Sequence, residues 1–299
     1  MFDTEIFSSY GFRRDSRWLV KAQTSTCVHP VRGTYSMSPC YESRYNPCMR
    51  ILLTNDDGIT APGMLALYRA AKSLGDVYVV APSGVCSAKS HSITLFEHIQ
   101  VTTHTNKDFT GHAVSGMPAD CVKIGCNGLI DGPIDLVISG INAGANIGIN
   151  VLYSGTVGAA REAVIQGIPA IAMSLHIGDR ERTHWDIATE HAATVLKQVI
   201  EHGVQPGHLL NINLPIFDDA KTVAGTRVCK LSDSAMADRY AQTPGDNGAT
   251  QYCVDYGMQF REHHENSDVH LLFDRHITIT PLLVYQTHNK HLQHWASRF

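Results

Sequence analysis

Two adjacent carboxylates, Asp56 and Asp57, follow a short apolar run at residues 51–53. A continuous apolar run of this kind is typical of a strand that is buried on both faces of a parallel sheet. The two acids would then lie at the carboxyl edge of the sheet, where open α/β sheets bind their ligands. Because neighbouring carboxylates repel each other unless a cation or a proton lies between them, the pair indicates a divalent metal site. An ordinary turn followed by a helix cap is the alternative for Asp-Asp-Gly taken alone.

A hydroxyl-rich loop follows the next expected strand. Residues 77–81 are apolar and predict a second buried strand, and the loop at residues 82–91 contains Ser87. Because parallel strands deliver the chain to the same edge of a sheet, Ser87 is expected on the same side as Asp56. It is therefore a candidate oxygen ligand.

An uncharged segment rich in glycine and asparagine, residues 140–150, follows the strand expected at 135–139. Its glycines permit tight turns, and its asparagine side chains provide neutral oxygen ligands. An ordinary flexible loop is the alternative, but the position at the end of a buried strand favours a functional role for Asn142 and Asn146. Hard oxygen ligands such as these favour Mg²⁺ or Mn²⁺ over zinc.

A Ser-Gly-Thr step, residues 154–156, precedes an expected helix. The start of a helix offers free backbone N–H groups and the positive end of the helix dipole, and here two hydroxyls are added. Helix capping alone would explain one hydroxyl and would not require the whole step. Ser154, Gly155 and Thr156 are therefore candidates for holding a phosphate group.

The elements that must position these residues alternate between strand and helix from Met49 onward. We expect helices near residues 62–74, 118–129, 157–167 and 184–202, strands at 170–175 and 209–214, and shorter strands within 92–115. This alternation predicts an α/β fold with a three-layer, Rossmann-like, mostly parallel sheet and helices on both faces.

Three regions divide the chain. Residues 1–48 lack apolar periodicity, and we expect a disordered or artefactual extension there, with the native start at Met49. Residues 49–215 are expected to form the Rossmann-like catalytic core. In residues 216–299 the alternation ends, and strands separated by polar loops are expected to form a C-terminal β-hairpin and tail and to complete the core.

Composition excludes several classes of function. The net charge of −4 gives no basic footprint for duplex nucleic acid, and no run of about twenty apolar residues could span a membrane. The 8 cysteines are scattered without Cys-x-x-Cys spacing, which favours reduced thiols and a cytoplasmic location. The 17 histidines include no His-Glu-x-x-His pattern.

Three common nucleotide and hydrolase motifs are missing. The first strand-to-helix turn reads Asn-Asp-Asp-Gly-Ile-Thr instead of Gly-x-Gly-x-x-Gly, and its acids would repel a pyrophosphate. No Gly-Lys-Ser/Thr follows a strand, and no Gly-x-Ser-x-Gly nucleophile is present. What remains is a set of oxygen ligands beside a helix start suited to phosphate.

Several motifs, in order from Met49 to Leu283, carry a resemblance to the stationary-phase survival protein (SurE) family of metal-dependent 5′/3′-nucleotidases. They are Thr54–Gly58, Val79–Pro82, Ser87, Ser92–Leu95, Gly116–Cys121, Ser139–Gly144, Tyr153–Val157, Ser267–Asp268 and Ile277–Leu282. The resemblance does not extend to residues 1–48.

The resemblance implies one divalent cation per subunit, Mg²⁺ or Mn²⁺, held by Asp56, Asp57, Ser87 and Asn142. It also implies hydrolysis of nucleoside 5′- or 3′-monophosphates. Substrate or phosphate contacts are expected from Asn55, Asn146, Ser154, Gly155 and Thr156. Family members are homodimers or homotetramers that exchange C-terminal strands and tail, which assigns residues 216–299 to oligomerisation.

Two positions depart from the family pattern. Ala88 stands where the family usually has glycine after the metal-binding serine, and Asn150 stands where it has aspartate. These changes leave open a second function, a nucleotide-binding regulatory protein with impaired turnover. For the enzyme, we expect water as the nucleophile with Asp56 and Asp57 as catalytic residues, and an aspartyl nucleophile is the rival mechanism.

Overall fold

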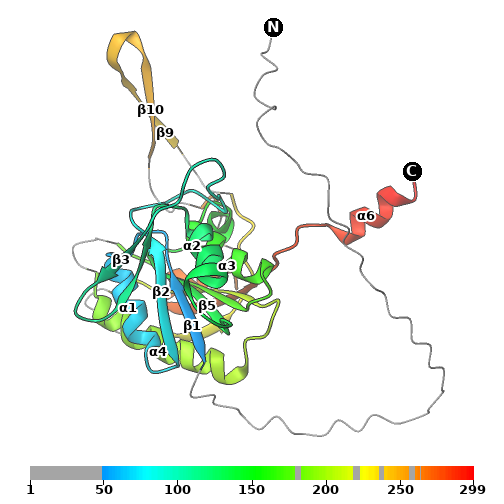
Figure 1. The fold of residues 1–299 in the computed structure, drawn as a ribbon. Helices are drawn as coiled ribbons and strands as arrows, with labels where there is room; N and C mark the ends of the chain where they lie inside the picture. Colours follow the sequence, from blue (N-terminus) through cyan, green and yellow to red (C-terminus); the bar gives the residue numbers. More distant parts are fainter. Residues whose placement is uncertain (1–48, 179–182, 218–222, 236–238, 256–259, 263) are drawn as a thin grey trace, which may run out of the picture. The chain divides into compact units, whose positions relative to one another are not determined.

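The computed structural model describes residues 49–178, 183–217, 223–235, 239–255, 260–262 and 264–299. The expectations for residues 1–48 concern a part of the chain outside these ranges. A nine-stranded sheet with the order β3-β4-β2-β1-β5-β6-β7-β11-β8 forms the body of the protein (Figure 1).

The strands are β1 (Arg50–Thr54), β2 (Asp76–Pro82), β3 (Val101–Thr105), β4 (Thr110–Val114), β5 (Leu136–Ala143), β6 (Ala170–Leu175), β7 (Leu209–Leu214), β8 (Gly225–Val228), β9 (Arg239–Pro244), β10 (Thr250–Asp255) and β11 (His276–Leu282). The helices are α1 (Pro62–Ala71), α2 (Pro118–Ile124), α3 (Gly155–Ile165), α4 (Trp185–His202), α5 (Asp268–Phe273) and α6 (Asn289–Ala296), with short helical turns η1 (Gly125–Leu129), η2 (Gly148–Leu152) and η4 (Asp246–Gly248).

Helices cover both faces of the central sheet, as predicted. Strand β1 is buried on both faces: Ile51 and Leu53 face one apolar cluster, and Leu52 faces the other. The first cluster contains the buried faces of α1 and α4, and the second contains those of α2 and α3. The α/β three-layer fold is therefore confirmed, and its continuous apolar strands reflect burial on both sides.

The strand order reverses direction at β1. Strand β2 pairs in parallel with one side of β1, and β5 pairs in parallel with the other side. The crevice outside the carboxyl ends of β1 and β5 is consequently the topological switch point, where open α/β sheets bind ligands. Asp56 and Asp57 follow β1, and Asn142 lies at the end of β5, so both sides of this crevice carry oxygen-bearing side chains.

The observed elements differ from the expected ones in three places on the core. Strand β5 continues to Ala143, so Asn142 lies on a strand and not in the following loop. Helix α2 ends at Ile124 and continues as the wider turn η1. Regular strands begin only at Val101 within 92–115, and in the stretch before it the Thr94 N–H donates to the Asp120 carboxylate.

The C-terminal part contributes to the same sheet. Strand β11 pairs antiparallel with β7 and parallel with β8, which extends the core sheet at one edge. Strands β9 and β10 form a separate antiparallel hairpin whose side chains in β9 are exposed throughout. A C-terminal hairpin is thus present as predicted, but the sequence did not locate its strand β9 or helix α5. No helix within the described residues is long and apolar enough to cross a membrane.

Candidate active site

Asp56 is a buried carboxylate at the switch point. Its residue is only 4% exposed, and the hydroxyl of Thr156 donates a hydrogen bond to its Oδ1 at 2.5 Å. Burial raises the pKa of Asp56 to about 6 and the neighbouring Asp57 adds to the rise, while hydrogen bonds from the side chain and backbone of Thr156 oppose it. The carboxylate therefore sits against the start of α3 in a place where negative charge needs a partner.

Asp57 links the end of β1 to the end of β5. Its Oδ2 accepts a hydrogen bond from the backbone N–H of Ala143 at 2.9 Å, and the residue is half-buried. Asn55 holds the same turn from inside: its Nδ2 donates to the Gly58 carbonyl at 2.8 Å, and its Oδ1 accepts from the Gly58 N–H at 3.1 Å. Both ends of the Asn55 amide are thus engaged within the loop that presents the acids.

The Ser-Gly-Thr step forms the start of α3, directly beside Asp56. Ser154 is the N-cap, and its Oγ accepts from the backbone N–H of Val157 at 3.0 Å. A Cβ added at Gly155 would lie 2.9 Å from both Cβ and Oδ2 of Asp56, so only glycine allows this approach. The Thr156 hydroxyl contacts the carboxylate itself and not the space in front of the helix.

Asn142 and Ser87 complete the predicted ligand set from two further elements. The Nδ2 of Asn142 donates to the carbonyl of Gly144 at 2.6 Å, which leaves Oδ1 as its atom for a cation. Ser87 is exposed in the loop after β2, and the adjacent Cys86 N–H donates to the backbone carbonyl of Asp56 at 2.7 Å. That bond brings the Ser87 loop to the acidic turn.

Asn146 belongs to a buried polar network that sequence reasoning missed. Its Nδ2 donates to Ser174 Oγ at 2.8 Å, and its backbone N–H donates to Asn213 Oδ1 at 2.8 Å. Its carbonyl accepts from the side chains of Asn211 and Asn213 at 2.8 and 3.0 Å. Asparagines at alternate positions of a strand expected to be apolar were the available signal, because buried polar groups need partners.

A buried acid from the C-terminal part holds the same glycine-rich segment. Asp268, which is fully buried, accepts from the backbone N–H groups of Gly148 and Ser232, each at 2.7 Å. Burial raises the pKa of Asp268, and these backbone hydrogen bonds oppose the rise. The segment that carries Asn142 and Asn146 is therefore supported from β7 and from α5.

The donor set suits a hard divalent cation. Within the part of the chain that the structure describes, no group of three or more His, Cys, Asp or Glu side chains could hold a metal. Two adjacent carboxylates with neutral amide and hydroxyl oxygens are instead the donors that Mg²⁺ or Mn²⁺ prefers, and zinc would favour nitrogen or sulfur. A cation at this place would also oppose the repulsion between Asp56 and Asp57.

Comparison with known proteins identifies relatives of this chain. The family model described as "Survival protein SurE" matches residues 51–238, which is well over half of the 299 residues. The chain belongs to the SurE family. The matched span of the SurE family includes the loops after β1 and β2, the end of β5 and the start of α3.

Relatives within the SurE family align with most of the chain. The protein named 5′-nucleotidase SurE from Syntrophobacter fumaroxidans is 40% identical over 241 residues, 80% of this chain and 95% of the relative. That from Polaromonas naphthalenivorans is 40% identical over 257 residues, 83% and 96% of the two chains. The crystal structure of the SurE protein from Aquifex aeolicus superposes with a TM-score of 0.71 at 33% identity, covering 82% of this chain and 97% of that one.

The departure at Ala88 has a structural counterpart. Ala88 has a φ of 57°, in the left-handed region where a side chain is disfavoured and glycine is not. The glycine that the SurE family pattern carries at this position would adopt the same backbone without that strain. The departure therefore adds backbone strain to the Ser87 loop and removes no oxygen donor.

Proposed function

We propose that this chain is a divalent-metal-dependent phosphomonoesterase that releases phosphate from nucleoside 5′-monophosphates. The observation that carries the proposal is the buried Asp56 carboxylate at the switch point, held by Thr156 against the start of α3 and beside Asp57. The relatives named 5′-nucleotidase SurE, which align almost end to end, support the same activity.

The cation would be held by Asp56, Asp57, Ser87 and Asn142. Two carboxylates supply charge, and the serine hydroxyl and the Asn142 Oδ1 add neutral oxygens, a set that fits Mg²⁺ or Mn²⁺. When bound, such an ion neutralises phosphate oxygens and lowers the pKa of a water. Asp57, which is less buried than Asp56, is the acid that would orient or deprotonate the attacking water.

The start of α3 would hold the phosphate. Ser154 Oγ accepts a hydrogen bond from Val157 N–H, so its own proton is available to donate to a phosphate oxygen. The N-terminal dipole of α3 also favours an anion here. Gly155 allows the phosphate site and Asp56 to lie close together. Thr156 and Asn55 act in this proposal by positioning the acids, and Asn146 by positioning its loop.

Cellular context and assembly complete the proposal. The cysteines Cys86, Cys121, Cys126, Cys229 and Cys253 are unpaired, as expected in a reducing compartment, which supports a cytoplasmic location. A homodimer or homotetramer is supported by the hairpin β9–β10, whose strands pair with each other and with no other strand among the described residues, and which carries exposed Tyr240 and Tyr252. Size-exclusion chromatography with light scattering measures this directly.

The decisive experiment is phosphate release from a panel of 5′- and 3′-nucleoside monophosphates. Pure protein is assayed with Mn²⁺ or Mg²⁺, and then with EDTA. We expect release that requires the cation and that falls by orders of magnitude in Asp57→Asn. Absence of metal-dependent release, together with retained nucleotide binding, would instead establish the regulatory alternative.

A second assay separates the two nucleophiles. Reaction of the protein with labelled substrate followed by acid quenching would trap an acyl phosphate if Asp56 or Asp57 attacks directly. We expect no label on the protein, because water attacks the phosphorus directly. Label on either aspartate would reject water as the first nucleophile.

A further inference from the structure

We propose that His91 and Glu162 form a clamp that positions Ser87 for the metal site, and this inference rests on the proposed function. His91 lies four residues beyond Ser87 in the same loop, and Glu162 lies in α3, the helix whose first turn holds Asp56. Nε2 of His91 is 2.9 Å from Oε2 of Glu162, and because a carboxylate only accepts, that ring nitrogen donates. The clamp thus connects two sides of one site.

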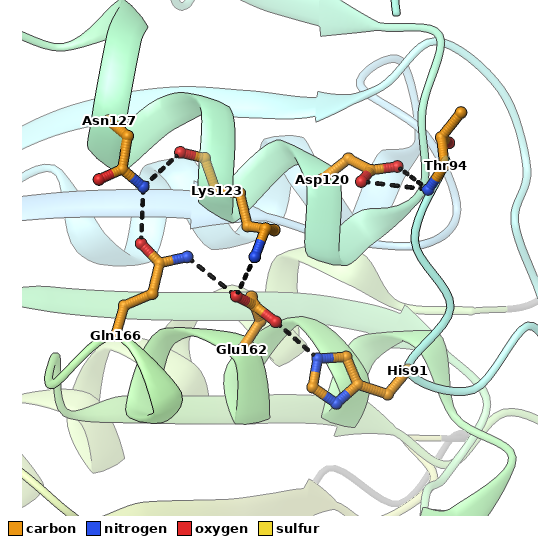
Figure 2. Close-up of polar contacts among 7 residues, drawn as sticks. All are labelled: His91, Thr94, Asp120, Lys123, Asn127, Glu162 and Gln166. Atoms are coloured by element: carbon orange, nitrogen blue, oxygen red, sulfur yellow. Dashed lines mark hydrogen bonds and ion pairs between the residues drawn. The ribbon is translucent and has the colours of Figure 1, made fainter. Parts of the chain in front are cut away.

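Glu162 is prepared for this contact from the other side. The residue is 5% exposed, and its Oε1 accepts from Lys123 Nζ at 3.2 Å and from Gln166 Nε2 at 3.0 Å. The Nδ2 of Asn127 donates to the Oε1 of Gln166 at 2.9 Å and to the Lys123 carbonyl at 2.8 Å. Figure 2 shows Lys123 and Gln166 meeting Glu162 at Oε1, and His91 meeting it at Oε2. The carboxylate is therefore a rigid anchor with one oxygen left for the loop.

The backbone around His91 lies directly on α3. The Ser90 N–H donates to the Tyr153 carbonyl at 3.0 Å, and its Oγ donates to the Leu152 carbonyl at 2.7 Å. A Cβ added at Gly158 would lie 2.6 Å from the Ser90 carbonyl oxygen, so the loop approaches the helix as closely as glycine allows. His91 adds a hydrogen bond between two side chains to this contact, at the point where the loop leaves α3.

Ser87 depends on these anchors for its place. Its side chain is exposed, and the bonds that hold its neighbours are the Cys86 N–H to the Asp56 carbonyl on one side and Ser90 with His91 on the other. Ala88, which lies between the two anchors, and Ser90, which belongs to the second, have left-handed backbones with φ of 57° and 53°. Such a segment needs external contacts to stay in one conformation, because these backbones are unfavourable for side chains. Loss of the clamp would therefore move Ser87 without removing it.

The test uses matched substitutions at both ends of the clamp. His91→Leu removes the donor and His91→Gln keeps one, while Glu162→Met removes the acceptor at similar volume. Mn²⁺ binding to the substrate-free protein is measured from the electron paramagnetic resonance signal of free Mn²⁺. We expect H91L and E162M to weaken Mn²⁺ binding about 10-fold, as for other groups that orient metal ligands, and H91Q to stay near wild type. The double variant should be no weaker than either single one.

Limited trypsin digestion gives a readout independent of activity and metal. Lys89 is an exposed residue inside the anchored loop, and cleavage after it yields a fragment end that mass spectrometry identifies. Faster cleavage at Lys89 is expected in H91L and E162M, and a wild-type rate in H91Q.

A control separates the clamp from general destabilisation. Asp108→Asn weakens the distant ion pair with Arg69 and touches neither His91 nor Glu162. It should keep wild-type Mn²⁺ affinity and Lys89 cleavage. Wild-type protein that binds Mn²⁺, with H91L and E162M binding as tightly, would overturn the clamp alone. Wild-type protein that binds no Mn²⁺ and releases no phosphate would overturn the proposed function and the clamp with it.

Discussion

Thr156 Oγ1 donates to Asp56 Oδ1 at 2.5 Å, between residues that are 100 positions apart in the chain. The bond joins the loop after β1 to the first turn of α3. It also stabilises the ionised form of Asp56, which burial disfavours. Helix start and acid therefore act as one unit at the switch point. The geometry of this pair leads to the first two predictions.

Replacing Thr156 by valine should impair the site without unfolding it. Valine has the same shape but no hydroxyl, and a hydrogen bond to a charged group contributes about 1.5–3 kcal/mol, or roughly 10- to 100-fold in metal affinity. We expect Mn²⁺ affinity and phosphate release to fall by factors in that range. Thr156→Ser keeps the donor and should retain most of both, and equal losses in the two variants would show that the hydroxyl is not the cause.

Replacing Gly155 by alanine should displace Asp56. The added Cβ would lie 2.9 Å from Cβ and Oδ2 of Asp56, and alanine otherwise favours a helix by about 1 kcal/mol. We expect phosphate release to be largely lost while the circular dichroism spectrum stays native. Gly128→Ala, where an added Cβ meets nothing within 4 Å, is the matched control and should leave activity unchanged. Full activity of Gly155→Ala would contradict the close approach of helix and acid.

Glycine and valine at position 88 should differ in their effect on stability. A left-handed backbone disfavours an L-residue by about 1–2 kcal/mol, and a β-branched side chain is worse placed there than alanine. We expect Ala88→Gly to raise the thermal midpoint or leave it level, since glycine removes strain but adds entropy to the unfolded chain. Ala88→Val should lower it. A loop that tolerated valine as well as glycine would not have the observed backbone at residue 88.

Glu162 should make stability depend on acid pH. Burial opposes its ionisation, but hydrogen bonds from Gln166, His91 and Lys123 outweigh burial and lower its pKa below the ordinary 4.5. A lowered pKa means that the unfolded state binds more protons, so the stabilisation is complete above about 4.5 and is lost as pH falls through the folded value. The free energy of unfolding, measured with urea at several pH values, should be higher for wild type than for Glu162→Gln, and the difference should be largest near neutrality. A difference that is constant with pH would reject the prediction.

The turn that carries Asp56 and Asp57 shows how much of the site local sequence patterns predict. The apolar run of β1 and the helical spacing of α1 place Asp56 and Asp57 at a strand end, and the structure has both elements there. Asn142 was expected just after a strand and lies on β5 itself, because the pairing of β5 with β6 resumes at Asn142 after a register shift. Local periodicity locates an element well and its last residue less well.

The residues that support the site make contacts that local sequence patterns do not predict. The residues near Asn211 in the chain do not indicate that its side chain donates to the Asn146 carbonyl. The carboxylate of Asp268 likewise accepts from the N–H of Gly148, which lies 120 residues away in the chain. From the sequence alone, Glu162 is an acid on an apolar helix with no sign of burial. In the structure, α2 and the Ser87 loop cover it. Each of these contacts is made only when distant segments pack together.

The sequence by itself determined the alternating α/β order, the acids after the first strand and the uncharged segment after a later one, because these depend on neighbours within a few residues. The tertiary structure alone decided that Thr156 holds Asp56, that Gly155 lies against it, and that Glu162 reaches His91. Those relationships follow from strand order and from the close packing of α3 on the Ser87 loop. Burial then requires a partner for each polar group that this packing encloses.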